Sequence, residues 1–85
     1  MAHLPLKRKE YMVKSNLEEM RSALAANVRE LRMQRGLSQE RLALEADVDR
    51  TLVSKIERVI ANPTLDVLAR LAAALEVPFI RLFKS

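Results

Sequence analysis

Cysteine and tryptophan are absent from this chain of 85 residues, and histidine occurs once. Without cysteine the chain can form neither a disulfide framework nor a thiolate metal site, and one histidine with no carboxylate cluster argues against a metal enzyme. The longest apolar runs are only a few residues, which is too short to span a bilayer. We therefore expect no metal, no cofactor and no membrane. The absence of a secretory signal pattern predicts a cytoplasmic protein.

Glycine is also scarce, with Gly36 as the only one, and there are three prolines among many Ala, Leu, Arg and Glu residues. This composition predicts helices with short connections. The length allows one domain, whose core buries only about 60 % of the unfolded surface, so a partner subunit would help. The net charge of +4 fits a polyanionic partner but does not require one.

The first 14 residues carry the basic run Lys7-Arg8-Lys9. We interpret residues 1–14 as an N-terminal extension and residues 15–85 as the folded domain. Three interpretations of the extension stay open: a solvated tail, a basic arm that contacts DNA phosphates or the minor groove, or a start artefact, since Met12 and Met20 could each begin a functional chain.

Ser15 and Glu18 have the spacing of a capping box, which predicts that a helix of about five turns begins there. Gly36 is expected to end it in the left-handed conformation. Residues 16–23 extend beyond the rest of the predicted domain, and either form a separate helix or pack on a partner subunit. The apolar residues recur at steps of three and four, giving one stripe: Leu17, Met20, Leu24, Val28 and Leu31.

Residues 39–58 are interpreted as two short helices joined by a tight turn. Ser38 and Asp49 are suitable N-caps, and the turn lies at residues 47–48. So short a turn makes the helices cross steeply, which explains a small Ala43 at the crossing and an apolar Val48 in the elbow. This spacing is typical of a helix-turn-helix.

The second of these helices has two faces. Val53, Ile56 and Ile60 fall on one side and predict its core face. Leu52 lies at the flank, either as a core-edge residue or as an apolar contact to a thymine methyl. A solvated helix surface is the alternative for the polar face. That face carries groups suited to base edges and phosphates: Arg50, Thr51, Ser54, Lys55 and Arg58.

Two further helices are expected after a loop. Thr64 is the predicted N-cap of a helix with the apolar stripe Leu65, Leu68, Leu71, Ala72 and Leu75, and Pro78 fits the first position of a short final helix. That helix is apolar on more than one side. We interpret its apolar residues as a homodimer contact, with a simple core cap as the alternative: Phe79, Ile80, Leu82 and Phe83.

Residues 24–83 resemble the Xre/Cro-type helix-turn-helix family of phage repressors and bacterial regulators. The resemblance lies in L-R-M-Q-R-G-L-S-Q-E-R-L-A, V-D-R-T-L-V-S-K-I-E-R and N-P-T-L-D-V-L-A-R-L-A-A-A-L-E-V, and D-R-T-x-x-S-x-I-E-R looks like restriction–modification controller proteins. It implies an all-α, compact five-helix lambda-repressor-like domain, here with an N-terminally extended first helix.

The resemblance also implies roles for single residues. Arg32 and Glu57 match a structural ion pair. The turn residue that is usually glycine is Asp47, and Val59-Ile60 replaces a glycine and basic residues that approach phosphate. Base-reading positions are Arg50, Thr51, Leu52 and Lys55, with Ser54 close by. Phosphate contacts are expected from Gln39, Arg35, Ser38, Arg58 and Asn62.

The function expected from these features is sequence-specific, DNA-binding transcription regulation, without enzymatic activity. A homodimer would place its third helices in successive major grooves of a pseudo-palindromic operator, about 34 Å apart. The alternative is an antitoxin-type regulator whose main partner is a toxin protein, bound by the N-terminal extension. An enzyme is disfavoured because Ser38, Ser54 and the carboxylates are explained by caps, ion pairs or solvent.

Overall fold

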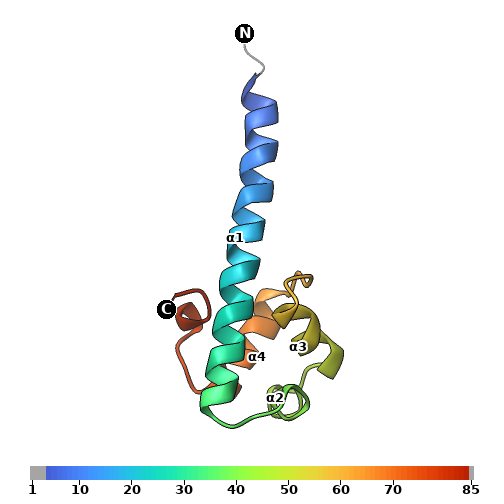
Figure 1. Ribbon diagram of the computed structural model, residues 1–85, viewed down its shortest axis with the longest axis vertical. Helices are drawn as coiled ribbons and strands as arrows, with labels where there is room; N and C mark the ends of the chain where they lie inside the picture. Colours follow the sequence, from blue (N-terminus) through green and yellow to red (C-terminus); the bar gives the residue numbers. More distant parts are fainter. Residues whose placement is uncertain (1–3, 85) are drawn as a thin grey trace.

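The computed structural model describes residues 4–84, which form four α-helices and one short 3-10 helix (Figure 1). The all-α class is therefore confirmed, with a 3-10 helix as the fifth element. Because α1 stands out from the body built by the other elements, the molecule measures 54 × 23 × 19 Å. No helix within residues 4–84 is long and apolar enough to cross a membrane. The elements are α1 (Leu4–Gln34), α2 (Gln39–Ala46), α3 (Arg50–Glu57), α4 (Leu65–Leu75) and η1 (Phe79–Leu82).

Helix α1 begins at Leu4, so the predicted cap at Ser15 is wrong: Ser15 lies inside a continuous helix of 31 residues. The reason is local, since residues 4–14 are rich in Leu, Lys, Arg, Glu and Met, which favour helices, and Pro5 is tolerated in a first turn. The basic run of the extension is therefore helical. The remainder of the extension, residues 1–3, lies outside the described residues.

The apolar stripe of α1 has two parts. Leu24, Val28 and Leu31 are buried in the core, whereas Leu17 and Met20 are 39 % and 43 % exposed. The N-terminal half of α1 projects clear of the body (Figure 1). Only the C-terminal half of the helix is therefore part of the domain core.

Every element supplies a side chain to that core. The largest fully buried residues come from all five elements: Val28, Leu42, Val53, Ile56, Leu71 and Leu82. Full burial of such a side chain is worth about 1.5–3 kcal/mol. Two predicted core residues are wrong, because Ile60 and Leu65 are 60 % and 73 % exposed. Helix α3 ends at Glu57, so its phase no longer applies at Ile60, and Leu65 is the first residue of α4.

The helix ends depend on left-handed residues. Gly36 follows α1 with φ +68°, and the Leu37 N–H donates to the Arg32 carbonyl at 3.0 Å, which confirms the expected stop. Asp47 and Glu76 end α2 and α4 with φ near +60°. Val59, two residues after α3, has φ +65°. A β-branched residue is the least suited to this conformation.

The C-terminal turn is fixed to α1. The side-chain Nδ2 of buried Asn27 donates to the Leu82 carbonyl at 3.0 Å, and the Leu82 side chain is fully buried. Leu82 is therefore a core residue, and its prediction as a direct dimer contact is wrong. Pro78 lies one residue before η1 and so does not occupy the predicted first helical position.

Candidate nucleic-acid interface

A three-residue turn sets α3 against α2. Asp47 has the left-handed conformation, Val48 donates its N–H to the Ala43 carbonyl at 3.0 Å, and Asp49 caps α3. The Asp49 carboxylate accepts from the backbone N–H and the hydroxyl of Thr51 at 2.9 and 2.8 Å, which lowers the pKa of Asp49. The predicted caps at Ser38, Asp49 and Thr64 are all formed. The turn thus fixes the first residues of α3.

Helix α3 buries one face and exposes the other. Val53 and Ile56 are at most 2 % exposed, and Leu52 packs at the core edge. This position of Leu52 favours the first of its two interpretations. On the outer side Ser54 is partly buried, and the remaining predicted polar residues are exposed: Arg50, Thr51, Lys55 and Arg58. A shallow hollow between α2 and α3 is lined by Gln39, Glu40, Arg50, Thr51 and Ser54.

Glu40 is a member of this surface that the sequence reasoning missed. Its Oε2 accepts from Arg50 Nη1 at 2.7 Å, and both side chains are about 70 % exposed. The available signal was an acidic residue in the first turn of α2. An exposed ion pair contributes only about 0–1 kcal/mol, so Arg50 can exchange Glu40 for another partner at small cost.

A partly buried polar network connects α1, α2 and α3. Arg32 donates from Nε and Nη2 to both Glu57 oxygens at 2.7 and 2.9 Å, and from Nη1 to the Leu37 carbonyl at 2.8 Å. Gln39 Nε2 donates to Glu57 at 3.0 Å. Burial alone would raise the pKa of Glu57, but the hydrogen bonds from Arg32 and Gln39 together lower it. The pKa of Arg32 is raised by the same pair. Glu57 thus holds α3 on α1 and orients Gln39.

The predicted phosphate ligands do not all lie together. Gln39 borders the hollow, and Ser38 uses its hydroxyl to cap α2. Arg35 pairs with Glu76 at the end of α4, at 3.0 Å. Arg58 is exposed directly after α3, whereas Asn62 lines a different groove, beside α1.

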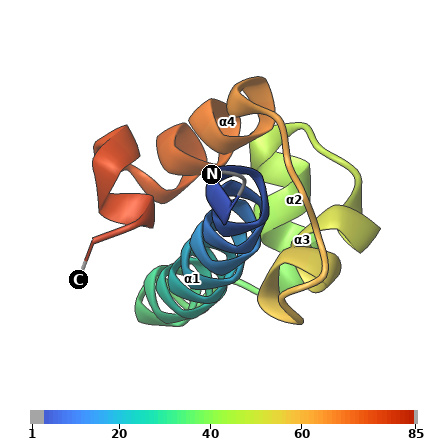
Figure 2. The same ribbon diagram turned by 90° about the horizontal axis from the view of Figure 1, so that it is seen from above.

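The predicted dimer residues lie away from this surface. Viewed from above, η1 is on the opposite side of α1 from α2 and α3 (Figure 2). Phe79 and Ile80 are 38 % and 60 % exposed, and Phe83 is partly buried, with its ring centroid 6.2 Å from that of Phe79. We call Phe79, Ile80 and Phe83 the C-terminal patch. A partner on this patch would leave the outer face of α3 free.

Within residues 4–84, no three His, Asp or Glu side chains are close enough to hold a metal.

The sequence matches the helix-turn-helix family HTH_3 over residues 28–82, a span that includes α2, α3 and the turn between them. The chain belongs to this family. The family expected from the sequence motifs is thereby confirmed.

The chain is similar to several named proteins of known sequence or structure. A hypothetical transcription factor of Neisseria meningitidis is 43 % identical over 60 residues, which cover 71 % of this chain and 57 % of the relative. The restriction-modification controller protein C.AhdI from Aeromonas hydrophila is 38 % identical with a TM-score of 0.71, over 74 % of this chain and 96 % of C.AhdI. A variant of the controller C.Esp1396I bound to its highest affinity operator site is 32 % identical with a TM-score of 0.69. The match covers 76 % of this chain and 86 % of the C.Esp1396I chain.

Proposed function

We propose that this protein is a sequence-specific DNA-binding transcription regulator, without enzymatic activity, that acts in the cytoplasm as a homodimer on a pseudo-palindromic operator. The observation that carries the proposal is the two-faced α3. Its core face is fully buried, while Arg50 and Thr51 stand exposed beside the N-terminus of α2 and Lys55 is exposed further along α3. The relatives named as a transcription factor and as restriction-modification controllers support it.

The outer face of α3 has the chemistry of a major-groove reader. The major groove admits an α-helix, arginine binds guanine O6 and N7 through two hydrogen bonds, and threonine bonds to bases or touches a thymine methyl. The N-terminus of α2 carries partial positive charge and suits a phosphate, which Gln39 would contact. Lys55 and Arg58 add cations to the same side. On DNA, Arg50 would leave Glu40 for a base.

The experiment begins with selection from a random duplex library, which gives the operator, its symmetry and its half-site spacing. Arg50→Ala is then expected to lose about 1–3 kcal/mol of binding free energy on that operator and to relax selectivity at one base pair. Fluorescence anisotropy titration at fixed salt measures the loss.

Arg41→Ala is the matched control. Arg41 is also an exposed arginine paired with a glutamate, Glu45, but it does not line the hollow between α2 and α3. Its operator affinity should change much less. Equal affinities for Arg50→Ala and the parent would remove Arg50 from base recognition. Failure of the parent to bind any duplex at low salt would favour the toxin-binding alternative.

The homodimer is tested at the C-terminal patch. Ile80→Glu should produce monomers in sedimentation equilibrium, because it puts a charge in the centre of an apolar contact. Ile80 is 60 % exposed, so the fold of the single chain should tolerate the change. A dimer that persists unchanged would exclude this patch as the interface.

A further inference from the structure

The projecting half of α1 carries an apolar face that the body covers only in part. Val13, Leu17 and Met20 continue the stripe of Leu24 and Val28 at steps of four, three, four and four residues. They are 58 %, 39 % and 43 % exposed, against 3 % and 0 % for the two core residues. Short helices are marginal in water without tertiary packing. This projecting stripe (Val13, Leu17 and Met20) is therefore a surface that a partner would stabilise.

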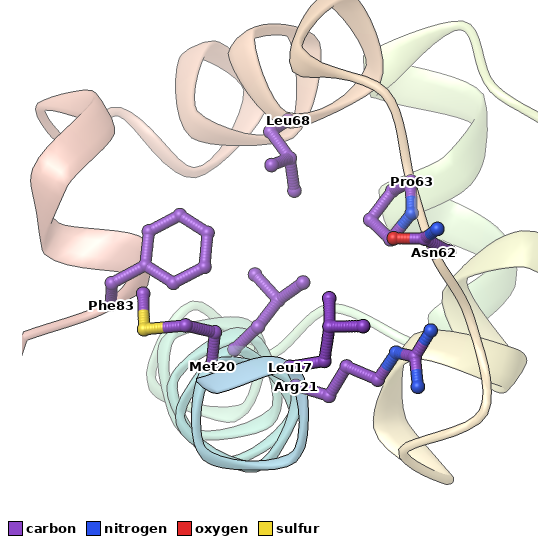
Figure 3. Close-up of a pocket in the computed structure, with 8 residues that line it drawn as sticks. Leu17, Met20, Arg21, Asn62, Pro63, Leu68 and Phe83 are labelled. Atoms are coloured by element: carbon purple, nitrogen blue, oxygen red, sulfur yellow. The ribbon is translucent and has the colours of Figure 1, made fainter. Parts of the chain in front are cut away.

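An apolar groove lies at the base of the projecting stripe (Figure 3). It has a volume of about 210 Å³, and α1, the loop before α4, α4 itself and the C-terminal turn all contribute to it. The Nε atom of Arg21 is buried beside it and has no hydrogen-bond partner among the residues that the structure describes. The lining side chains include Leu17, Met20, Pro63, Leu68 and Phe83. Through Phe83 the groove is continuous with the C-terminal patch.

The shape of the groove limits how a second copy can approach. Leu68 and Phe83 of the body lie on the same side of α1 as Leu17 and Met20 (Figure 3). A parallel pair of α1 helices joined along the stripe would bring two bodies into the same space. An antiparallel pair places one body at each end, and the first turns of one α1 then enter the groove of the other chain.

We propose that the N-terminal half of α1 binds the same segment of a second copy in antiparallel orientation, with its first turns in the partner's groove. The proposal rests on the proposed homodimer and extends its interface beyond the C-terminal patch. Because a two-fold axis repeats each contact, one short stripe and one groove supply two stripe-to-groove contacts.

The charges beside the stripe fit this orientation. Glu10 and Arg21 are 11 residues apart, close to three helical turns, so they flank the stripe on the same side. In an antiparallel two-fold pair the same flanks of both helices meet. The register that sets Val13 against the partner's Leu17 also brings Glu10 to within one residue of the position opposite the partner's Arg21. Each Arg21, whose Nε has no hydrogen-bond partner among the described residues, thereby gains the Glu10 carboxylate of the partner subunit. This contact occurs twice in the dimer.

The first test compares dimer dissociation constants by sedimentation equilibrium. The double variant Leu17→Glu with Met20→Glu should raise the dimer dissociation constant by more than about tenfold. Each of these apolar side chains would add burial free energy to the interface, and each occurs twice in the dimer. The matched control is Tyr11→Glu with Met12→Glu, because these exposed apolar residues lie off the stripe on the same helical segment. It should leave the constant nearly unchanged. Helical circular dichroism verifies that both variants remain folded.

The outcomes separate this inference from the proposed function. A parent chain that stays monomeric overturns both the homodimer and the helix pairing. If Ile80→Glu dissociates the dimer and the stripe variant does not, the helix pairing alone is overturned. If only the stripe variant dissociates it, the pairing stands and the C-terminal patch is excluded.

The second test measures orientation, and the lack of native cysteine makes it direct. In the proposed register Asn16→Cys lies close to its own copy, whereas Lys9→Cys lies about 18 Å from its copy along the helix axis. A short bismaleimide should therefore cross-link Asn16→Cys and spare Lys9→Cys. Equal cross-linking at both positions would indicate a parallel pair, and cross-linking at neither would exclude the interface.

The charge contact can be tested by exchange. Glu10→Lys should weaken the dimer because it places a lysine beside Arg21 of the partner subunit. Glu10→Lys combined with Arg21→Glu should restore it, since the exchanged charges again attract. A double variant that is no tighter than Glu10→Lys alone would overturn the proposed register.

Discussion

The two halves of α1 share one helix and one apolar stripe but have different surroundings. In the C-terminal half, Leu24, Val28 and Leu31 are at most 6 % exposed. In the N-terminal half, Val13, Leu17 and Met20 keep a third or more of their surface in water. Periodicity in the sequence therefore marks which face of a helix is apolar. It does not mark where along the helix the chain's own core ends.

The polar groups of the two halves differ in the same way. In the C-terminal half, Asn27 donates to the Leu82 carbonyl and Arg32 donates to Glu57, so distant segments are bound to the helix. In the N-terminal half, Arg21 keeps a buried Nε without a hydrogen-bond partner among the described residues. The C-terminal half is complete within one chain, and the N-terminal half is suited to a second chain.

The largest expected effect comes from the network of the C-terminal half. Glu57→Gln removes the charge that Arg32 needs, and breaking a buried ion pair from one side typically costs about 3–5 kcal/mol. The Glu57 side chain is 4 % exposed and that of Arg32 is 13 %. Urea denaturation should show this loss in the free energy of unfolding. Glu45→Gln, in the exposed Arg41 pair, should lose no more than about 0.5 kcal/mol.

The same pair predicts a dependence on pH. The pKa of Glu57 in the folded protein is lowered from the ordinary value of 4.5. A lowered pKa adds stability that is fully present above the unfolded value and is lost as pH falls through the folded value. The stability difference between the parent and Glu57→Gln should thus be constant near neutral pH and shrink below about pH 4.5. A difference that grows on acidification would contradict the assignment.

The stripe itself gives the next effect in size. Leu24→Ala should destabilise the single chain by about 2–5 kcal/mol, because it leaves a cavity in the core. Leu17→Ala should change it much less when measured at concentrations where the chain is monomeric, because Leu17 is already 39 % exposed. Thermal unfolding at low concentration compares the two. Similar losses would show that the N-terminal half packs within one chain after all.

The smallest effect concerns strain in the loop beside the groove. Val59→Gly should stabilise the fold by up to about 1 kcal/mol. The left-handed conformation costs a residue with a Cβ about 1–2 kcal/mol, and glycine avoids this cost. Part of the gain is offset because glycine loses more conformational entropy when the chain folds. Val59 is 40 % exposed, so little burial is lost. Ile60→Gly, in the same loop without positive φ, should not stabilise. Equal unfolding midpoints for Val59→Gly and the parent would show that the strain is relieved elsewhere.

The structural features that depend only on neighbouring residues could be predicted from the sequence. Ser38, Asp49 and Thr64 cap their helices, and Gly36 ends α1, because each contact spans only a few residues. The start of α1 was misplaced for a local reason as well. The capping spacing at Ser15 competes with residues 4–14, most of which are good helix formers, and continuing a helix costs less than starting one.

Contacts between distant residues were not predictable from spacing. The Arg32–Glu57 pair was expected only through the family resemblance. Asn27 with Leu82, and Glu40 with Arg50, are set by how the helices pack, and local sequence identifies neither pair of partners. Ile60 was placed in the core by extending the phase of α3 past its real end. Of the site, its helix and polar face were predictable, and the partners of its side chains were not.

The hydrogen bond from Asn27 to Leu82 also joins α1 to the last core residue of the chain. It joins residues 55 positions apart, so its closure carries a larger loop entropy than any cap in the chain. The helix-turn-helix pair is local and can form earlier, but the core lacks a fully buried leucine until residue 82 arrives. During synthesis, the Asn27 side chain lacks its acceptor, the Leu82 carbonyl, until the ribosome has added residue 82. The proposed DNA-binding helices α2 and α3 therefore reach their full stability only when the C-terminal turn, on the opposite side of α1, is in place.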